Sequence, residues 1–169
     1  LCARDQTVLI PERSACCPMA GMVHADEAEE AWRRLSAHWG DDLVPVTYQN
    51  SDAQVKAFCW RHGGAVCTSA NAQTIMRWAL GQRSHLLFFP DEHLGRNSAL
   101  ALGVPEDRIA VWDPRDPDGS EERAAAARVV VWIGYCHVHT RFTVNDVRAV
   151  RAHYPLARVV VHPECTAPV

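Results

Sequence analysis

The sequence LVPVTYQNSDAQVKAFCWRHGGAVCTSA, residues 43–70, decides the fold class because it contains a complete strand–helix–strand unit. LVPVT is short, apolar and β-branched, which is typical of a buried strand, and the polar residues YQN follow it. Ser51 is a favoured N-cap and Gly63-Gly64 a favoured helix end, so residues 51–64 predict a helix. AVCTSA then predicts a second strand. A helical crossover of this kind joins parallel strands.

The same alternation continues on both sides of this unit. Further helices are predicted at residues 26–40, 71–82 (capped by Asn71), 91–103 (beginning at Asp91) and 143–155. Further strands are predicted at residues 6–11, 85–90, 108–112, 128–134 and 157–165. Strands that alternate with helices of this length predict an α/β fold, with a parallel sheet covered on both faces. Residues 113–127 break the alternation, and we expect a solvent-exposed insertion with a helix at its Ala-rich end.

Composition and charge exclude several classes of protein. The chain has 169 residues, of which 48% are hydrophobic, enough for one compact domain or parts of two. With 17 basic and 20 acidic residues, it lacks the excess of positive charge that is typical of nucleic-acid-binding proteins. Its apolar runs are far shorter than the ~20 residues of a membrane span, and no signal-peptide pattern is present. The chain begins without Met and ends just after a predicted strand, so we expect a fragment of a longer protein.

The cysteines indicate a reducing compartment. There are seven, an odd number without a CxxC pair, which does not fit the disulfide framework of a small secreted protein. We therefore expect a cytoplasmic protein. Free cysteine is among the most buried residue types, and we expect Cys2, Cys59 and Cys67 to pack as small core residues.

Two stretches of the chain repeat one order of elements. The first runs from strand TVLIP through Cys17 and a helix to strand LVPVT and the polar tip at Tyr48. The second runs from strand RVVVW through Cys136 and a helix to strand ARVVV and the tip His162-Pro163-Glu164. Such repetition predicts pseudo-symmetric units. Since ligands bind beyond the carboxyl ends of parallel strands, we expect these polar tips to line a site.

Three kinds of site could use the stretch GYCHVH, residues 134–139. Cys136, His137 and His139 offer zinc ligands, although structural zinc sites usually show paired short spacings. A cysteine nucleophile is less favoured, because neighbours in sequence rarely face each other productively. An iron–sulfur cluster can take thiolates from distant loops, such as Cys17 and Cys136, and one iron left open would act as a Lewis acid. A zinc-binding domain, or a non-catalytic α/β binding or structural module with buried Cys and His, stays an open alternative.

Six motifs carry a resemblance to a known family. CCPMAGM, VTYQNSDAQVKAFC, VCTSANA, FFPDEHLGR, GYCHVHTRFT and VVVHPEC occur in the same order in the NadA-type quinolinate synthases. The resemblance covers nearly the whole chain. It implies αβα sandwich domains with short parallel sheets in a pseudo-threefold arrangement, about half of which is present here. Residues 1–42 would be the end of a first domain with Cys17, residues 43–157 a central domain with Cys136, and residues 158–169 the first strand of a third domain.

The resemblance also implies a cofactor and a reaction. A [4Fe-4S] cluster would be held by Cys17, Cys136 and a third cysteine outside this chain, and Cys16 and Cys165 would be bystanders. The enzyme would condense iminoaspartate with dihydroxyacetone phosphate to quinolinate, in de novo NAD biosynthesis, with loss of phosphate and water. L-aspartate oxidase or aspartate dehydrogenase would supply the iminoaspartate. This chain alone would be inactive, because a cluster ligand is missing.

The resemblance assigns roles to particular side chains. The catalytic acid–base groups would be Tyr48 and Glu164, which would move protons during the isomerisation and dehydration steps. The residues that would bind substrate are Tyr48, Asn50, Ser69, His139 and His162.

Overall fold

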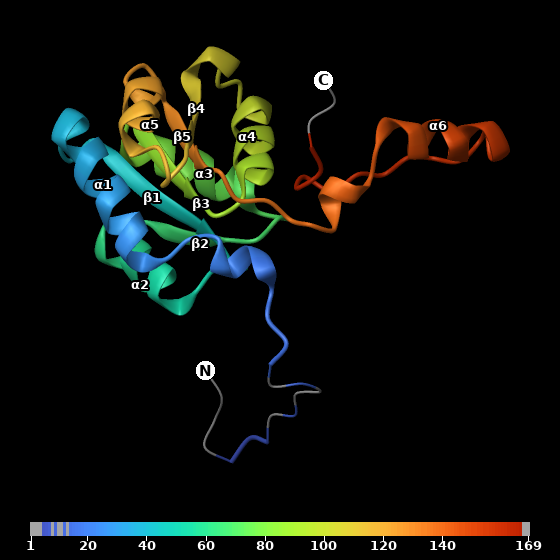
Figure 1. The fold of residues 1–169 in the computed structure, drawn as a ribbon, viewed down its shortest axis with the longest axis horizontal. Coiled ribbons are helices and arrows are strands. Elements are labelled where there is room, and N and C mark those ends of the chain that lie inside the picture. Colours follow the sequence, from blue (N-terminus) through green and yellow to red (C-terminus); the bar gives the residue numbers. More distant parts are fainter. Residues whose placement is uncertain (1–4, 8, 10–11, 13, 167–169) are drawn as a thin grey trace.

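A five-stranded, all-parallel sheet forms the centre of the molecule in the computed structural model, which describes residues 5–7, 9, 12 and 14–166 (Figure 1). The strand order is β2-β1-β3-β5-β4. The strands are β1 Leu43–Tyr48, β2 Ala65–Cys67, β3 His85–Phe89, β4 Ile109–Trp112 and β5 Val129–Trp132. The predicted α/β fold with a parallel sheet is confirmed.

Six helices and three short 3-10 turns accompany the strands in the described residues. The helices are α1 Ala25–Trp39, α2 Ala53–Arg61, α3 Ala72–Gln82, α4 Glu92–Ala101, α5 Pro117–Ala124 and α6 Val144–His153. The 3-10 turns are η1 Pro18–Gly21, η2 Glu106–Arg108 and η3 His139–Arg141.

Two separate apolar clusters lie on the two faces of the sheet. Val44 and Val46 of β1 join one cluster, with buried residues of α3 and α4. Leu43 of the same strand joins the other, with buried residues of α1, α2 and α5. Alternate residues of a strand point to opposite faces, so a strand that is apolar throughout is buried on both. The result is an αβα sandwich.

The start of α2 differs by one residue from the prediction. Asp52, not Ser51, is the N-cap, and its side chain accepts a hydrogen bond from Gln54 N at 2.8 Å. Ser51 is buried instead, where its hydroxyl donates to the carbonyl oxygen of Tyr48 at 2.8 Å and accepts from Thr47 Oγ1 at 2.9 Å. The prediction of Ser51 as the cap was wrong because this hydroxyl closes the end of β1.

The segment 113–127 is more ordered and less exposed than predicted. Its helix, α5, forms from the acidic part that begins at Pro117 and ends at Ala124, before most of the Ala-rich end. Asp116 caps the helix by accepting from Gly119 N at 3.1 Å. Ser120 and Ala124 are buried, and Ala124 joins the core on the α1 side of the sheet. The segment is therefore the helical crossover from β4 to β5, and the predicted exposed insertion was wrong.

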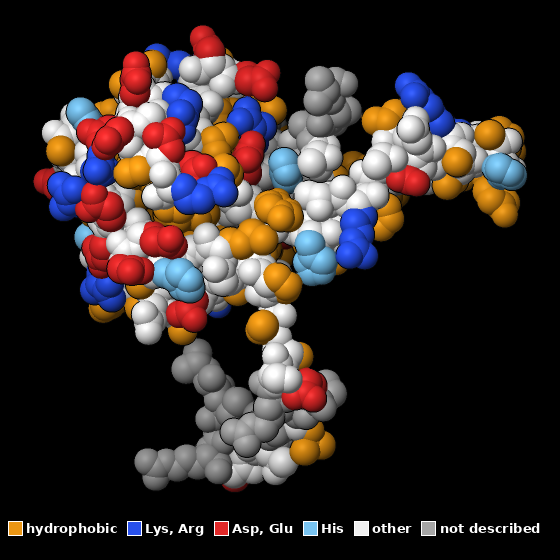
Figure 2. All heavy atoms as spheres, in the orientation of Figure 1, with side chains coloured by type: hydrophobic (Ala, Val, Ile, Leu, Met, Phe, Trp, Pro, Cys, Tyr) orange, Lys and Arg blue, Asp and Glu red, His pale blue; other side chains and the backbone are white. Residues whose placement is uncertain are grey.

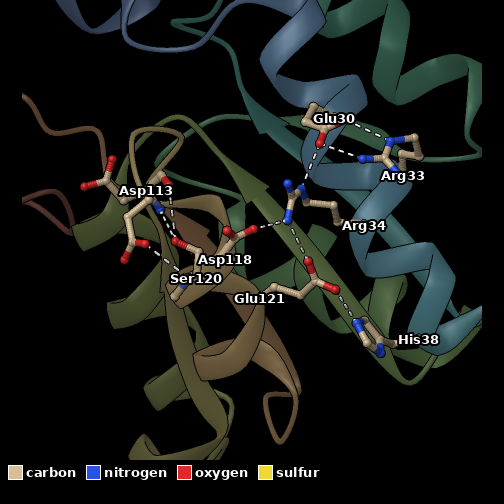
Figure 3. A network of polar contacts seen from close by, with 10 residues as sticks. Glu30, Arg33, Arg34, His38, Asp113, Asp118, Ser120 and Glu121 are labelled. Carbon is tan, nitrogen blue, oxygen red and sulfur yellow. Dashed lines mark hydrogen bonds and ion pairs between the residues drawn. The ribbon is translucent and has the colours of Figure 1, made fainter.

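A network of ion pairs links α5 to α1 (Figure 3). Arg34 of α1 reaches Asp118 at 2.7 Å and Glu121 at 3.0 Å, and it also pairs with Glu30 of its own helix at 2.7 Å. His38 approaches the second oxygen of Glu121. Exposed ion pairs contribute little individually. Burial of Ala28 and Ala31 of α1 and Ala124 of α5 in one core cluster also holds both helices to the sheet.

The last part of the described chain stands apart from the sandwich. Figure 1 shows α6 projecting away from the sheet, followed by a chain that returns toward α4. Residues 157–162 form no strand in this part of the structure, and the side chain of Val160 is 90% exposed. The strand predicted at 157–165 is thus absent from the described residues, because no neighbouring strand lies beside it to complete a ladder.

The other predictions about organisation have mixed outcomes. Of the strand predicted at residues 6–11, residues 8, 10 and 11 lie outside the described residues, and residues 6, 7 and 9 form no strand. The domain boundaries predicted between residues 42 and 43 and between residues 157 and 158 stay predictions. Helix α1 lies against the sheet and α2.

On the face shown in Figure 2, acidic and basic side chains are interspersed over the sandwich. None of the helices in the described ranges is both long and apolar enough to cross a bilayer.

Candidate functional site

The candidate site lies at the carboxyl ends of three neighbouring strands, β1, β3 and β5. The chain passes from β1 to β2 at one edge and then to β3 on the other side of β1, so the strand order switches between β1 and β3. Ligand crevices of open α/β sheets form at such a switch. Tyr48 ends β1, Asp91 follows β3, and Cys136 follows β5. Three side chains from distant parts of the sequence are thereby directed to one edge.

Close backbone contact joins the loop after β5 to the start of α4. Asp91 and Gly134 form a parallel bridge, and Glu92 N donates to the carbonyl oxygen of Gly134 at 2.7 Å. A Cβ at position 134 would lie 2.1 Å from the carbonyl oxygen of Pro90, so only glycine allows this approach. The loop that carries Cys136 is therefore held against the N-terminus of α4.

Asn97 of α4 holds the returning segment after α6. Its side-chain amide donates to the carbonyl oxygens of Pro163 and Cys165, both at 2.9 Å. Within the segment, Cys165 N donates to the carbonyl oxygen of His162 at 2.9 Å, which closes a turn. This turn places Glu164 in the site.

Replacing Asn97 should loosen this turn without unfolding the sheet. In Asn97→Ala both amide donors are lost, and in Asn97→Asp a carboxylate would face two carbonyl oxygens, so the aspartate variant should be the worse of the two. Faster amide exchange in a peptide spanning residues 157–166, with strand β3 unchanged, is the expected result in hydrogen-exchange mass spectrometry. Unchanged exchange of this peptide in Asn97→Asp would contradict the proposed anchor.

Cys136, His139 and Glu164 form a compact group of potential metal ligands. One ligand atom from each lies within 4.8 Å of the others, and His139 Nε2 is 3.1 Å from Glu164 Oε2. The His162 ring stacks on the His139 ring, with centroids 4.5 Å apart, and its Nδ1 lies 3.6 Å from Glu164 Oε2. Glu164 is almost completely buried, and its Oε1 makes no hydrogen bond within the described ranges. Four of the predicted site residues are thus brought together.

Tyr48 belongs to the same site. Its burial, above all, and the neighbouring Glu164 carboxylate raise the pKa of Tyr48 to about 12, while the side chains of Gln49 and Ser69 act in the opposite direction. The phenol therefore keeps its proton at neutral pH. Ser69 is partly buried after β2, and Asn50 is partly buried just after β1, so both lie at the carboxyl edge of the sheet.

Cys17 lies at the same end of the sheet but outside the compact ligand group. Cys17 and Cys136 are both partly buried and contact the same apolar cluster. The turn that follows Cys17 is fixed to the end of β5, because Trp132 Nε1 donates to the carbonyl oxygen of Met22 at 2.7 Å. The structure thus brings Cys17 to the same region as Cys136.

The remaining cysteines and His137 do not join the group. Cys59 and Cys67 are buried, as predicted, and burial raises the pKa of Cys67 to about 12, which disfavours the thiolate. Cys16 is exposed, and Cys2 lies outside the described residues. His137 is exposed, so the zinc set of Cys136, His137 and His139 considered from the sequence is not formed; Glu164 takes the third place.

Asp91, predicted from the sequence to start a helix at the carboxyl end of a strand, is also part of the site. It is fully buried, and Oδ1 accepts from Leu94 N at 2.6 Å while Oδ2 has no hydrogen bond in the part of the chain that is described. Burial raises the pKa of Asp91 to about 7, and the charge of Glu164 adds to this; nearby backbone N–H groups, including that of Cys136, oppose it. The sequence placed Asp91 and Glu164 at strand ends, but their burial and their closeness to each other required the fold.

Asp91 should make folding stability depend on pH. Its pKa is about 7 in the folded state against 3.8 as the ordinary value, so the folded protein binds the extra proton between these values. The stability that this proton provides is complete below about pH 4 and is lost as the pH rises through 7. The substitution Asp91→Asn would keep the cap acceptor without an ionising group. In urea unfolding, this variant should therefore show a shallower fall of the unfolding free energy between pH 5 and pH 7. If the unfolding free energy of Asp91→Asn falls with pH as steeply as that of the wild type, another group causes the pH dependence.

Comparisons with known proteins show which family the chain resembles. A family model described as "Quinolinate synthetase A protein" matches residues 1–169. The chain is 45% identical over 165 residues to a quinolinate synthase of Bacillus cereus strain B4264, covering 95% of this chain and 44% of that protein. It is 45% identical over 168 residues to a quinolinate synthase of Corynebacterium glutamicum, covering 98% of this chain and 43% of that protein. The chain therefore spans less than half the length of these relatives.

Proposed function

The chain belongs to the quinolinate synthetase A protein family, and we propose from this premise that the complete protein is a quinolinate synthase in which these residues form part of the active site. The main support for the proposal is that three separate segments of the chain place Tyr48, Cys136 and Glu164 close together at one edge of the sheet. The protein would act in NAD biosynthesis. A location in the cytoplasm stays a prediction from the use of cysteine.

The proposed reaction condenses iminoaspartate with dihydroxyacetone phosphate, with loss of phosphate and water. L-aspartate oxidase or aspartate dehydrogenase would supply the iminoaspartate. The substrate carboxylates need hydrogen-bond donors, and polar side chains at the sheet edge offer them. Those we assign to substrate binding are Tyr48, Asn50, Ser69, His139 and His162.

Tyr48 and Glu164 are the proposed proton-transfer pair. Isomerisation and dehydration require a proton to leave a carbon and another to reach a leaving hydroxyl. With its pKa at about 12, Tyr48 carries its proton at neutral pH, as a proton donor must. The Glu164 carboxylate is buried beside it and has a free oxygen among the described groups, which suits an acceptor. Burial also excludes water that would compete for the proton.

Cys17 and Cys136 fit a [4Fe-4S] cluster by their chemistry and their position. Thiolates are the usual ligands of such clusters, and both cysteines are partly accessible at the same end of the sheet, whereas Cys59 and Cys67 are buried. They would supply two ligands, and a cysteine outside residues 1–169 would supply the third. When bound, the cluster supplies an open iron that polarises a substrate oxygen.

Anaerobic reconstitution of the complete protein with iron and sulfide tests the proposal. We expect a broad visible absorption and formation of quinolinate from iminoaspartate and dihydroxyacetone phosphate. Both should be lost in Cys17→Ser and in Cys136→Ser, whereas Cys16→Ser, at the exposed neighbour of Cys17, should retain both. A full cluster in the two former variants would refute the ligand assignment. A cluster without quinolinate formation would refute the activity.

A further inference from the structure

We propose that the cluster-free protein binds one zinc ion through Cys136 Sγ, His139 Nε2 and the Glu164 carboxylate. These three side chains form the compact ligand group described above. The site shares Cys136 with the proposed cluster but differs from the cluster site in using His139 and Glu164 and in not using Cys17. Only the competition between zinc and cluster rests on the proposed function.

The distances suit a tetrahedral zinc ion. Zinc binds nitrogen and oxygen at about 2.0–2.2 Å, so two such ligands at a tetrahedral angle lie roughly 3.3–3.6 Å apart. The observed separation of His139 Nε2 and Glu164 Oε2 is 3.1 Å. Cys136 Sγ lies within 4.8 Å of one ligand atom of His139 and one of Glu164. A zinc–sulfur bond of about 2.3 Å puts the sulfur roughly 3.5–3.7 Å from the other ligands, so it has to approach by no more than about 1.3 Å. A side-chain rotation of Cys136, which is only partly buried, is sufficient.

The His139 ring is oriented for metal binding. Its Nδ1 lies 3.5 Å from Cys165 Sγ, and the tautomer with its proton on Nδ1 donates to this sulfur and leaves the lone pair of Nε2 facing Glu164. The stacked ring of His162 fixes the ring plane. Metal-binding histidines usually donate their other ring N–H to a partner in this way. Cys165 thus acquires a role as a support for the histidine.

Burial and charge favour a cation at this place. The Glu164 side chain is only 4% exposed, and its Oε1 is unpartnered among the described atoms. An uncompensated buried carboxylate is costly, and a divalent ion with one thiolate and one carboxylate gives a neutral set. Sulfur and nitrogen ligands favour zinc over magnesium or calcium. The His139 side chain is 20% exposed, which leaves an open side for a water molecule as the fourth ligand.

This site predicts that zinc inhibits cluster assembly. Cys136 cannot hold zinc and contribute fully to a cluster at the same time, so a zinc-loaded protein would resist reconstitution. Zinc would thus block the enzyme at its assembly stage.

Metal titration of the complete protein, prepared anaerobically without iron and sulfide, tests the site. Competition with a chromophoric chelator should give one zinc per chain, and cobalt should give tetrahedral absorption bands with a thiolate charge-transfer band. Cys136→Ser should abolish that band, and His139→Ala and Glu164→Gln should each weaken zinc binding by at least ~10-fold. His137→Gln, at the exposed neighbouring histidine, is the matched control and should bind zinc like the wild type. Circular dichroism establishes that each variant is folded.

Two results separate this site from the cluster. Cys17→Ser should keep its zinc while losing the cluster, and prior loading with zinc should reduce cluster formation in the wild type until a chelator removes it. The zinc site is overturned if the wild type binds no stoichiometric zinc, or if Glu164→Gln and His139→Ala bind it unchanged. Normal zinc binding in a protein that makes no quinolinate would instead count against the proposed function alone.

Discussion

Glu164→Gln is expected to lower kcat for quinolinate formation by about 10²- to 10⁴-fold, the usual contribution of a general acid–base group. Glutamine has nearly the same shape but cannot accept a proton at neutral pH. Because Asn97 holds the turn through the backbone of Pro163 and Cys165, the variant should keep the position of residue 164. The reconstituted complete protein should therefore retain its visible absorption while turnover falls.

A matched substitution controls for the loss of one negative charge. Glu122 is exposed on α5, a helix whose buried Ala124 belongs to the core cluster on the α1 side of the sheet, whereas Tyr48 and Cys136 belong to the other cluster. Glu122→Gln should therefore leave turnover and absorption unchanged. A turnover of Glu164→Gln within about threefold of the wild type would remove Glu164 from the proton-transfer steps. Loss of the cluster itself in this variant would instead assign Glu164 a role in cluster binding.

Tyr48→Phe is expected to lower kcat by about 10²-fold or more, because the phenol is the proposed proton donor and a phenyl ring cannot replace it. The substitution removes one buried oxygen and keeps the ring in the core, so the fold should persist. Removing the hydroxyl also removes a neighbour of Glu164, which should change the pH dependence of kcat. The measurement is a pH–rate profile of both proteins, together with substrate KM values.

The phenol of Tyr48 can also be observed directly. With a pKa of about 12, it should be missing from the tyrosines that ionise near pH 10 in an ultraviolet titration. Tyr135→Phe is the control for the loss of a tyrosine hydroxyl elsewhere. Tyr135 is exposed after β5, so this variant should keep wild-type turnover. A pH–rate profile and kcat of Tyr48→Phe like those of the wild type would exclude Tyr48 from catalysis and leave it a binding residue at most.

The sheet could be predicted because its strands are recognisable one at a time. Runs such as LVPVT and HLLFF are apolar on both faces, and the helices between them carry caps such as Asp91 and ends such as Gly103. These are local signals. Ser51 and Asp52 are neighbours, and either could cap α2 by its intrinsic N-cap preference. Asp52 is the cap because the Ser51 hydroxyl is bound to the carbonyl oxygen of Tyr48 at the end of β1, a contact that residue preferences do not predict.

The sequence by itself determined the α/β class, the burial of Cys59 and Cys67 and, through its ordered motifs, the family and the residues to examine. Only the tertiary structure decided that Asp91 is a buried acid beside Glu164, that Asn97 anchors the final turn, and that GYCHVH contributes Cys136 and His139 but not His137. The physical reason is that strand order is set by packing of whole elements. That order, and the return of the chain after α6, bring residues together that are remote in sequence.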